Sequence, residues 1–182
     1  MTKRLFLAAV SLLLFAAPLR AQEAGGKVLV VLTSFFANSL LDGGLLRVLQ
    51  FKQAGLEVHI LFEGSSVLAF LDLHGELDKP AWQKKVKGLE DDLARPGQAA
   101  ARIVRPPRYQ VAGKKLGLPP ALRTLLQSVL DLQIPYTVSA QAAGDFMAFD
   151  ELTAAAEPLS ADPENPADIS DFIKQGYTVV VY

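Results

Sequence analysis

The polar residues best suited to chemistry stand where three apolar runs, residues 27–33, 56–62 and 134–139, come to an end. If these runs are strands of an open parallel sheet, ligands bind beyond their carboxyl ends, and the residues that follow line one polar pocket. Backbone N–H groups at the helix starts near Ser39 and Ser65 could hold an anion there. The same residue types are also typical of turns and helix caps, so both interpretations stay open. The candidate ligand-binding residues are Thr33, Ser34, Asn38, Glu63, Gly64, Ser65, Ser139 and Gln141.

Ser139 is the candidate nucleophile of this set, and it would need a base and a group that orients the base. The chain has two histidines, His59 and His74. His59 lies inside an apolar run rather than at its end, which favours a packing role. The sequence has no G-x-S-x-G elbow, and residues 64–66 lack the second glycine and the lysine of a phosphate loop. We therefore predict no catalytic residue. The alternative is an enzyme of unknown class that uses non-thiol residues at the strand ends.

A metal site is the other chemistry that the histidines could support. His74 lies close in sequence to Asp72 and Glu76, and these side chains could ligate a metal ion only if the chain were extended there. A solvated loop at the exit of a helix explains the same pattern. The chain has no cysteine, which excludes disulfides, thiolate metal sites and a thiol nucleophile. We predict neither a metal nor another cofactor.

The first 21 residues have the pattern of a secretory signal peptide. Lys3 and Arg4 precede the apolar stretch 5–17, and a short exit ends at the small residue Ala21. We expect cleavage near Ala21, a periplasmic or secreted protein, and one domain over residues 22–182. No later apolar run approaches about 18 residues, so we expect no membrane association after the leader is removed.

Charge is unevenly distributed along the rest of the chain. Residues 75–119 hold ten basic and five acidic residues, whereas the remainder of 22–182 holds five basic and 14 acidic residues. This basic insertion is either a solvated loop folded on its own acidic body or a surface for an anionic ligand or a partner chain. Nucleic acid is a poor partner for an exported acidic protein. The candidate anion or partner contacts are Arg102, Arg105 and Arg108.

The order of apolar runs and helical patterns predicts an α/β fold. The continuous β-branched run KVLVVLT is typical of a strand buried on both faces. Amphipathic spacing predicts helices between the strands, including 80–95 and a helix that begins at Pro120, and Pro166 and Gly176 bracket a last helix. Such alternation predicts right-handed crossovers and a parallel sheet. The expected strands are 27–33, 56–62, 134–139, a brief one at 158–160, and 177–182.

Four segments in this order resemble the DsrE family of sulfur-relay proteins. They read KVLVVLTS, HILFEGSSVLAFL, LLQSVLDLQIPYTVSA and ISDFIKQGYTVVVY. The resemblance implies a three-layer α/β/α sandwich on a mostly parallel five-stranded sheet. It also implies a homo-oligomer, commonly a trimer or a hexamer.

The chain departs from that family where sulfur chemistry would occur. In sulfur-carrying members a cysteine follows the strand that corresponds to 136–138, and here Ser139 stands at the nearest position, followed by Ala140 and Ala142. A persulfide cannot form on a hydroxyl. Export and the basic insertion are further departures. We therefore expect a periplasmic DsrE-like protein without sulfur-transfer cysteine. It either binds a small ligand, with a small anion as the candidate, or acts as an oligomeric assembly protein linked to sulfur metabolism.

Overall fold

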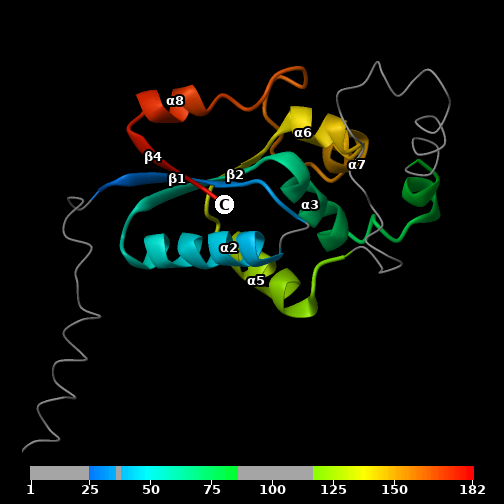
Figure 1. Ribbon diagram of the computed structural model, residues 1–182, viewed down its shortest axis with the longest axis horizontal. Coiled ribbons are helices and arrows are strands. Elements are labelled where there is room, and N and C mark those ends of the chain that lie inside the picture. The colour runs from blue at the N-terminus through cyan, green and yellow to red at the C-terminus, as the bar shows by residue number, and fades with distance from the viewer. Residues whose placement is uncertain (1–24, 36–37, 86–116) are drawn as a thin grey trace, which may run out of the picture.

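The chain folds around a parallel sheet of four strands, so the predicted α/β class is confirmed (Figure 1). The computed structural model describes residues 25–35, 38–85 and 117–182. Its strands are β1 (Lys27–Leu32), β2 (Glu57–Phe62), β3 (Tyr136–Val138) and β4 (Tyr177–Val181). They are ordered β3-β2-β1-β4, and every neighbouring pair is parallel.

The central strand β1 is buried on both faces, as its unbroken apolar sequence predicts. Successive side chains of a strand point to opposite faces. Val28, Val30 and Leu32 accordingly belong to the larger core cluster. Leu29 and Val31 belong to a smaller cluster on the other face. The sheet is thus packed with apolar side chains on both sides.

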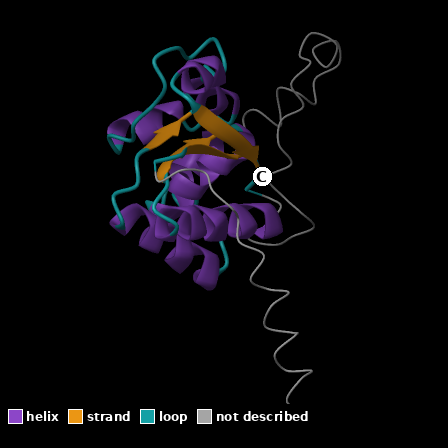
Figure 2. Cartoon of the chain, turned by 90° about the vertical axis from the view of Figure 1, so that its left-hand side faces the viewer, coloured by secondary structure: helices purple, strands orange, loops and turns teal. Residues whose placement is uncertain are grey.

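Helices supply the partners of these two clusters. Figure 1 shows α2 (Asn38–Gln53) and α5 (Pro120–Asp131) on one side of the sheet and α8 (Ile169–Lys174) on the other. Figure 2 shows the same arrangement in a view turned by 90°. The shorter helical elements follow the ends of β2 and β3 and are η1 (Gly64–Val67), α3 (Leu68–Leu73), α6 (Ala140–Asp145) and α7 (Phe149–Ala154).

A glycine lets α2 lie unusually close to the sheet. A Cβ atom added at Gly44 would stand 2.2 Å from Leu32 Cδ2 and 3.2 Å from Tyr182 Cβ. The neighbouring Gly43 has no atom within 4 Å of such a Cβ. Gly44 is therefore a packing requirement at the carboxyl ends of β1 and β4, although a glycine inside a helix is by itself unfavourable.

The expected strand at 158–160 forms only one bridge, between Leu159 and Val138. Backbone hydrogen bonds from Val138 N to Pro158 O (2.9 Å) and from Ser160 N to Val138 O (2.8 Å) hold it beside β3. The structure therefore has four strands in its described part where five were expected. The fifth strand and the three-layer arrangement stay predictions.

The two ends of the basic insertion are part of the folded body. Leu77 and Trp82 are each 2% exposed, and Lys85 Nζ lies 3.3 Å from Asp150 Oδ2 and 3.2 Å from Glu151 Oε2. Residues 80–85 are helical, as predicted for the first part of 80–95. The leader, the rest of that helix and the three candidate arginines lie outside the described residues. Over the described ranges, no helix is both long and apolar enough to cross a membrane.

Candidate functional site at the carboxyl edge of the sheet

The residues that follow the strands meet at one edge, as the sequence predicts for a parallel sheet. At the carboxyl end of each strand, backbone hydrogen bonds extend the pairing between neighbouring strands by one residue. Glu63 N donates to Leu32 O (2.8 Å), Ser139 N donates to Phe62 O (2.9 Å), and Thr33 N donates to Tyr182 O (2.8 Å). Thr33, Glu63, Ser139 and Tyr182 therefore lie side by side, one after each strand.

The turn after β2 is fixed by its own serines. Ser65 Oγ accepts a hydrogen bond from Phe35 N (3.0 Å). Ser66 Oγ lies 2.6 Å from Leu32 O and 2.8 Å from Glu63 O, and either carbonyl can accept its proton. Both serines are buried. Their hydroxyls bind neighbouring backbone groups, as those of turn residues do.

Gly64 allows this turn to pass close to the end of β1. Its φ is +54°, a region that favours glycine. A Cβ atom there would stand 2.8 Å from Thr33 O. The requirement for glycine at this candidate site residue is thus a steric one.

Ser139 is sealed inside the fold. It is 0% exposed, and its Oγ accepts a hydrogen bond from Ala142 N at 3.2 Å, which caps the start of α6. The next residue, Ala140, donates its N–H to Ser160 Oγ (2.9 Å). These contacts enclose the hydroxyl between β3, α6 and the segment that follows α7. A substrate atom has no approach to it in this conformation.

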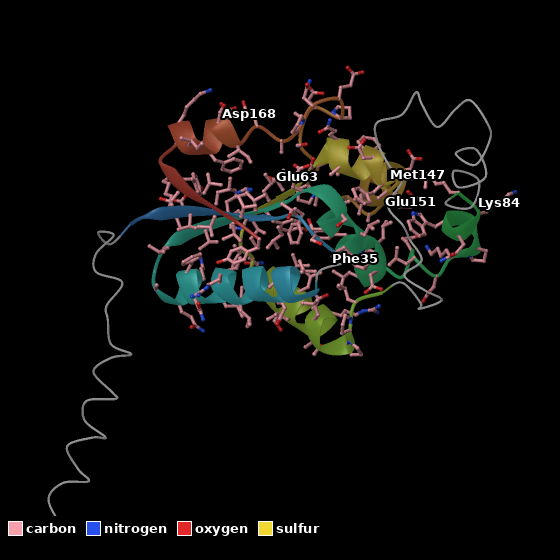
Figure 3. All side chains as sticks on the ribbon, viewed as in Figure 1. Phe35, Glu63, Lys84, Met147, Glu151 and Asp168 are labelled. Atoms are coloured by element: carbon pink, nitrogen blue, oxygen red, sulfur yellow. The ribbon has the colours of Figure 1, made fainter. Side chains whose placement is uncertain are left out.

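The remaining candidates at the edge are half-buried and meet solvent. Thr33 Oγ1 donates to Tyr182 O (2.7 Å), and Glu63 Oε1 accepts from Gly64 N (3.2 Å). Gln141 Nε2 lies 3.4 Å from Glu164 O. Figure 3 shows Glu63 where β2 runs into the turn before α3. Ser34 is half-buried beside Thr33, and the side chain of Asn38 lies outside the described residues. Thr33, Ser34, Glu63 and Gln141 therefore form the accessible part of the candidate site.

An open hollow of about 600 Å³ borders this edge, between the segment 160–168 and the start of α8. Ser160 and Glu164 connect this segment to the start of α6, because they accept hydrogen bonds from Ala140 N and Gln141 Nε2. The hydrogen bond from the Asn165 side chain lowers the pKa of Asp162, and that from Ser170 lowers the pKa of Asp168. Both carboxylates are thus charged at neutral pH. Together with Glu63 they make the described part of the site acidic, which favours neutral or cationic groups over an anion.

Both histidines bind partners other than Ser139. His59 Nε2 shares a hydrogen bond with Thr137 Oγ1 (2.9 Å), and its ring lies 4.7 Å from that of Phe172 between centroids. Burial lowers the pKa of His59. This position within the sheet agrees with the packing role predicted for it. The other histidine of the chain, His74, is bound to Glu157. Neither histidine is therefore placed to act as a base for Ser139.

The second histidine belongs to a separate cluster behind α3. His74 Nε2 lies 2.6 Å from Glu157 Oε1, and Tyr136 Oη donates to Glu157 Oε2 (2.8 Å). Asp72 instead pairs with Arg123 of α5, at 2.8 Å between Oδ2 and Nη2. Asp72 and His74 thus bind different partners. Within the described ranges, no three histidine, aspartate or glutamate side chains come together in a way that could hold a metal ion.

Sequence reasoning missed two contributors to the edge. Ser160 caps the backbone of Ala140 across 20 residues, and Tyr182 closes the ladder beside Thr33 across 149 residues. The parallel register of β4 beside β1 places Tyr182 there, and only knowledge of the strand order could have revealed it.

Comparisons of the chain with protein-family models, curated proteins and solved structures found no match.

Proposed function

We propose that this chain is an exported DsrE-like protein that binds a small polar molecule at the carboxyl edge of its sheet, assembles into oligomers and transfers no sulfur covalently. The proposed site consists of Thr33, Ser34, Glu63 and Gln141, with the bordering hollow as additional space. The proposed fold is the three-layer sandwich, with the segment around Leu159 as its fifth, short strand. The proposed location is the periplasm or the extracellular space, and the proposed context is sulfur metabolism.

The observation that carries this proposal is the position of Ser139. In the family that the sequence resembles, a cysteine follows the third strand, and here that position holds a hydroxyl that is 0% exposed and caps α6. A reactive group must reach its substrate, and a capping oxygen with no outward path cannot do so. The position has therefore become part of the framework, which leaves non-covalent binding as the activity that the edge supports.

The enzyme alternative lacks support from the geometry. A serine mechanism needs a base within hydrogen-bond reach of the nucleophile. His59 and His74 bind Thr137 and Glu157 instead. The accessible carboxylate at the edge, Glu63, is turned back to its own helix start at Gly64 N. Each of these groups is engaged in another contact rather than placed to take a proton from Ser139.

Two parts of the chain suit ligand groups of different charge. The described edge is acidic, so an anion would depend on Arg102, Arg105 and Arg108 of the insertion. A neutral or cationic molecule would need only the edge. We propose the edge as the primary site, and the arginines as the contacts that admit an anionic group on the same ligand or partner.

Mass spectrometry of the purified chain without its leader tests the proposal. Native spectra of gently purified protein should show a retained small molecule, which is lost on denaturation. A Ser34→Ala/Gln141→Ala variant should retain less of it, whereas Thr124→Ala, on the exposed face of α5, should retain as much as the parent chain. After incubation with thiosulfate, the denatured chain should have its unmodified mass. A sulfur adduct that survives denaturation would overturn the proposal, and so would retention that the double variant does not change.

A further inference from the structure

Among the described residues, the outer side of β4 is an open edge of the sheet. In the described part of the chain, β4 is the last strand next to β1, and no strand pairs with its other side. Figure 2 shows the strand that ends at the label C at one margin of the sheet. Val181 is 61% exposed, and Thr178 is also exposed.

The hydrogen bonds to β1 show which groups face outward. Tyr182 N donates to Val31 O (2.8 Å), and Tyr182 O accepts from Thr33 N (2.8 Å). Alternate residues of a parallel strand bond to the same neighbour, so Val180 and Thr178 also direct their backbone groups toward β1. Tyr177, Val179 and Val181 therefore direct their N–H and C=O groups away from it, along the open edge.

This edge has none of the features that usually protect an exposed strand. Residues 175–182 contain no charged residue and no proline, and the register with β1 runs from Tyr177 to Val181 without a bulge. Natural proteins blunt such edges with charges, prolines or bulges because an open edge is a template for another strand. A neutral β-branched edge is thus suited to permanent pairing.

We propose that β4 pairs antiparallel with β4 of a second copy of this chain, about a twofold axis at Val179. In an antiparallel ladder, the residues of a hydrogen-bonded pair exchange both of their backbone bonds. Pairing Val179 with its own counterpart places Tyr177 opposite Val181 of the second copy, and the reverse. All three outward residues then occupy hydrogen-bonded positions, and the two sheets become one.

Charge leaves the β4 edge as the place where two copies of the chain can meet. Outside the basic insertion the chain without its leader has five basic and 14 acidic residues, so two bodies repel over most of their surface. The nearest charges to β4 are already neutralised: Lys27 pairs with Glu57 at 3.3 Å, and Lys174 pairs with Asp171 at 2.9 Å. The β4 edge is therefore where two acidic copies can approach without facing like charges.

This inference rests on the assembly part of the proposed function and specifies its contact. A twofold contact produces a dimer, or a hexamer with dihedral symmetry, and is incompatible with a simple cyclic trimer.

Disulfide trapping tests the twofold axis, because the chain has no cysteine of its own. In the proposed pair, the Cα atoms of Val179 and its counterpart lie about 5.5 Å apart, within the range that a disulfide spans. Mild oxidation of Val179→Cys should produce a covalent dimer. Leu132→Cys, 51% exposed at the end of α5, should remain monomeric on a denaturing gel. Failure of Val179→Cys to cross-link in an assembled sample would overturn the inference.

Charge substitution at Val181 tests the register. Val181 would face Tyr177 of the second copy, whose side chain lies beside the paired Lys27 and Glu57. Val181→Lys and Val181→Glu should therefore each weaken association by about tenfold or more, because either charge would lose water in the contact. Leu132→Lys should leave it unchanged. Sedimentation velocity over a dilution series measures all four proteins.

The outcomes separate the inference from the proposed function. A parent chain that is monomeric throughout the series overturns both the inference and the assembly proposal. A trimer, or an oligomer that Val181→Lys leaves intact, overturns the inference alone, as does a complex in which a different protein occupies β4. An effect of only one of the two charges at position 181 would contradict the proposed register. Circular dichroism of each variant shows that the fold is retained.

Discussion

Replacing Ser139 with alanine should destabilise the protein without removing any chemistry. The substitution deletes the acceptor of the Ala142 N–H, which lies 3.2 Å from Ser139 Oγ at the start of α6. Loss of an N-cap hydroxyl costs about 0.5–2 kcal/mol of folding free energy. Ser139 and Ala142 are both buried, so water cannot replace the lost acceptor, and we expect a loss of about 2 kcal/mol, at the upper end of that range.

Urea unfolding provides the measurement, with Trp82 as the fluorescent probe, because it is the only tryptophan and is 2% exposed. Ser128→Ala is the matched control, since its hydroxyl bonds Thr124 O on the exposed side of α5. That substitution should change the free energy of unfolding by no more than about 0.5 kcal/mol. A loss below about 0.5 kcal/mol for Ser139→Ala, equal to the control, would refute the reasoning. Ser139 would then be free for another role.

Three further predictions concern packing, pH and the insertion. Gly44→Ala should lower the free energy of unfolding by about 1–3 kcal/mol through overpacking against Leu32, whereas Gly43→Ala should raise it by about 0.5–1 kcal/mol. Chemical denaturation measures both variants, and stabilisation by both substitutions would contradict the close packing at Gly44. Burial lowers the pKa of His59 below 6.5 in the folded state. Near that pH the unfolded chain therefore binds more protons than the folded chain, and the free energy of unfolding should fall as the pH drops below about 7. The fall should have a slope of at most about 1.4 kcal/mol per pH unit and should level off below the pKa of His59 in the folded state. His59→Gln should lose that component, and equal slopes in the two proteins would argue against it. Lys85→Ala should cost at most about 1 kcal/mol because its ion pairs with Asp150 and Glu151 are only partly buried. A larger loss in urea unfolding would contradict this assignment of a surface contact.

Much of the fold could be predicted from local patterns. The unbroken apolar run of β1 indicated a central strand because both of its faces are covered, and the helical spacing after Pro120 indicated α5. Strand order could not be predicted, because it depends on which chain ends pair in space. The position of Tyr182 beside Thr33 is one result of that order.

The positions of the candidate site residues could be predicted from the sequence, but the burial of their side chains could not. Sequence position correctly grouped Thr33, Glu63 and Ser139 at one edge, since all follow parallel strands. It could not distinguish a hydroxyl that faces a ligand from one that caps a helix. Ser139 is a buried helix cap and Ser65 a buried turn residue, whereas Gln141 is half-buried and accessible. Exposure depends on what packs over a residue, and for Ser139 that is the distant segment around Ser160.

The most direct test of the account is the reactivity of a thiol placed at position 139. The parent chain has no cysteine, so Ser139→Cys and Gln141→Cys each carry one thiol, two residues apart. We predict that an aromatic disulfide reagent labels Gln141→Cys readily and labels Ser139→Cys at least about a hundredfold more slowly, because the latter thiol reacts only when the fold opens locally. Equal labelling rates in the folded proteins would show that position 139 is accessible as a reactive cysteine must be, and would contradict the claim that it has become part of the framework.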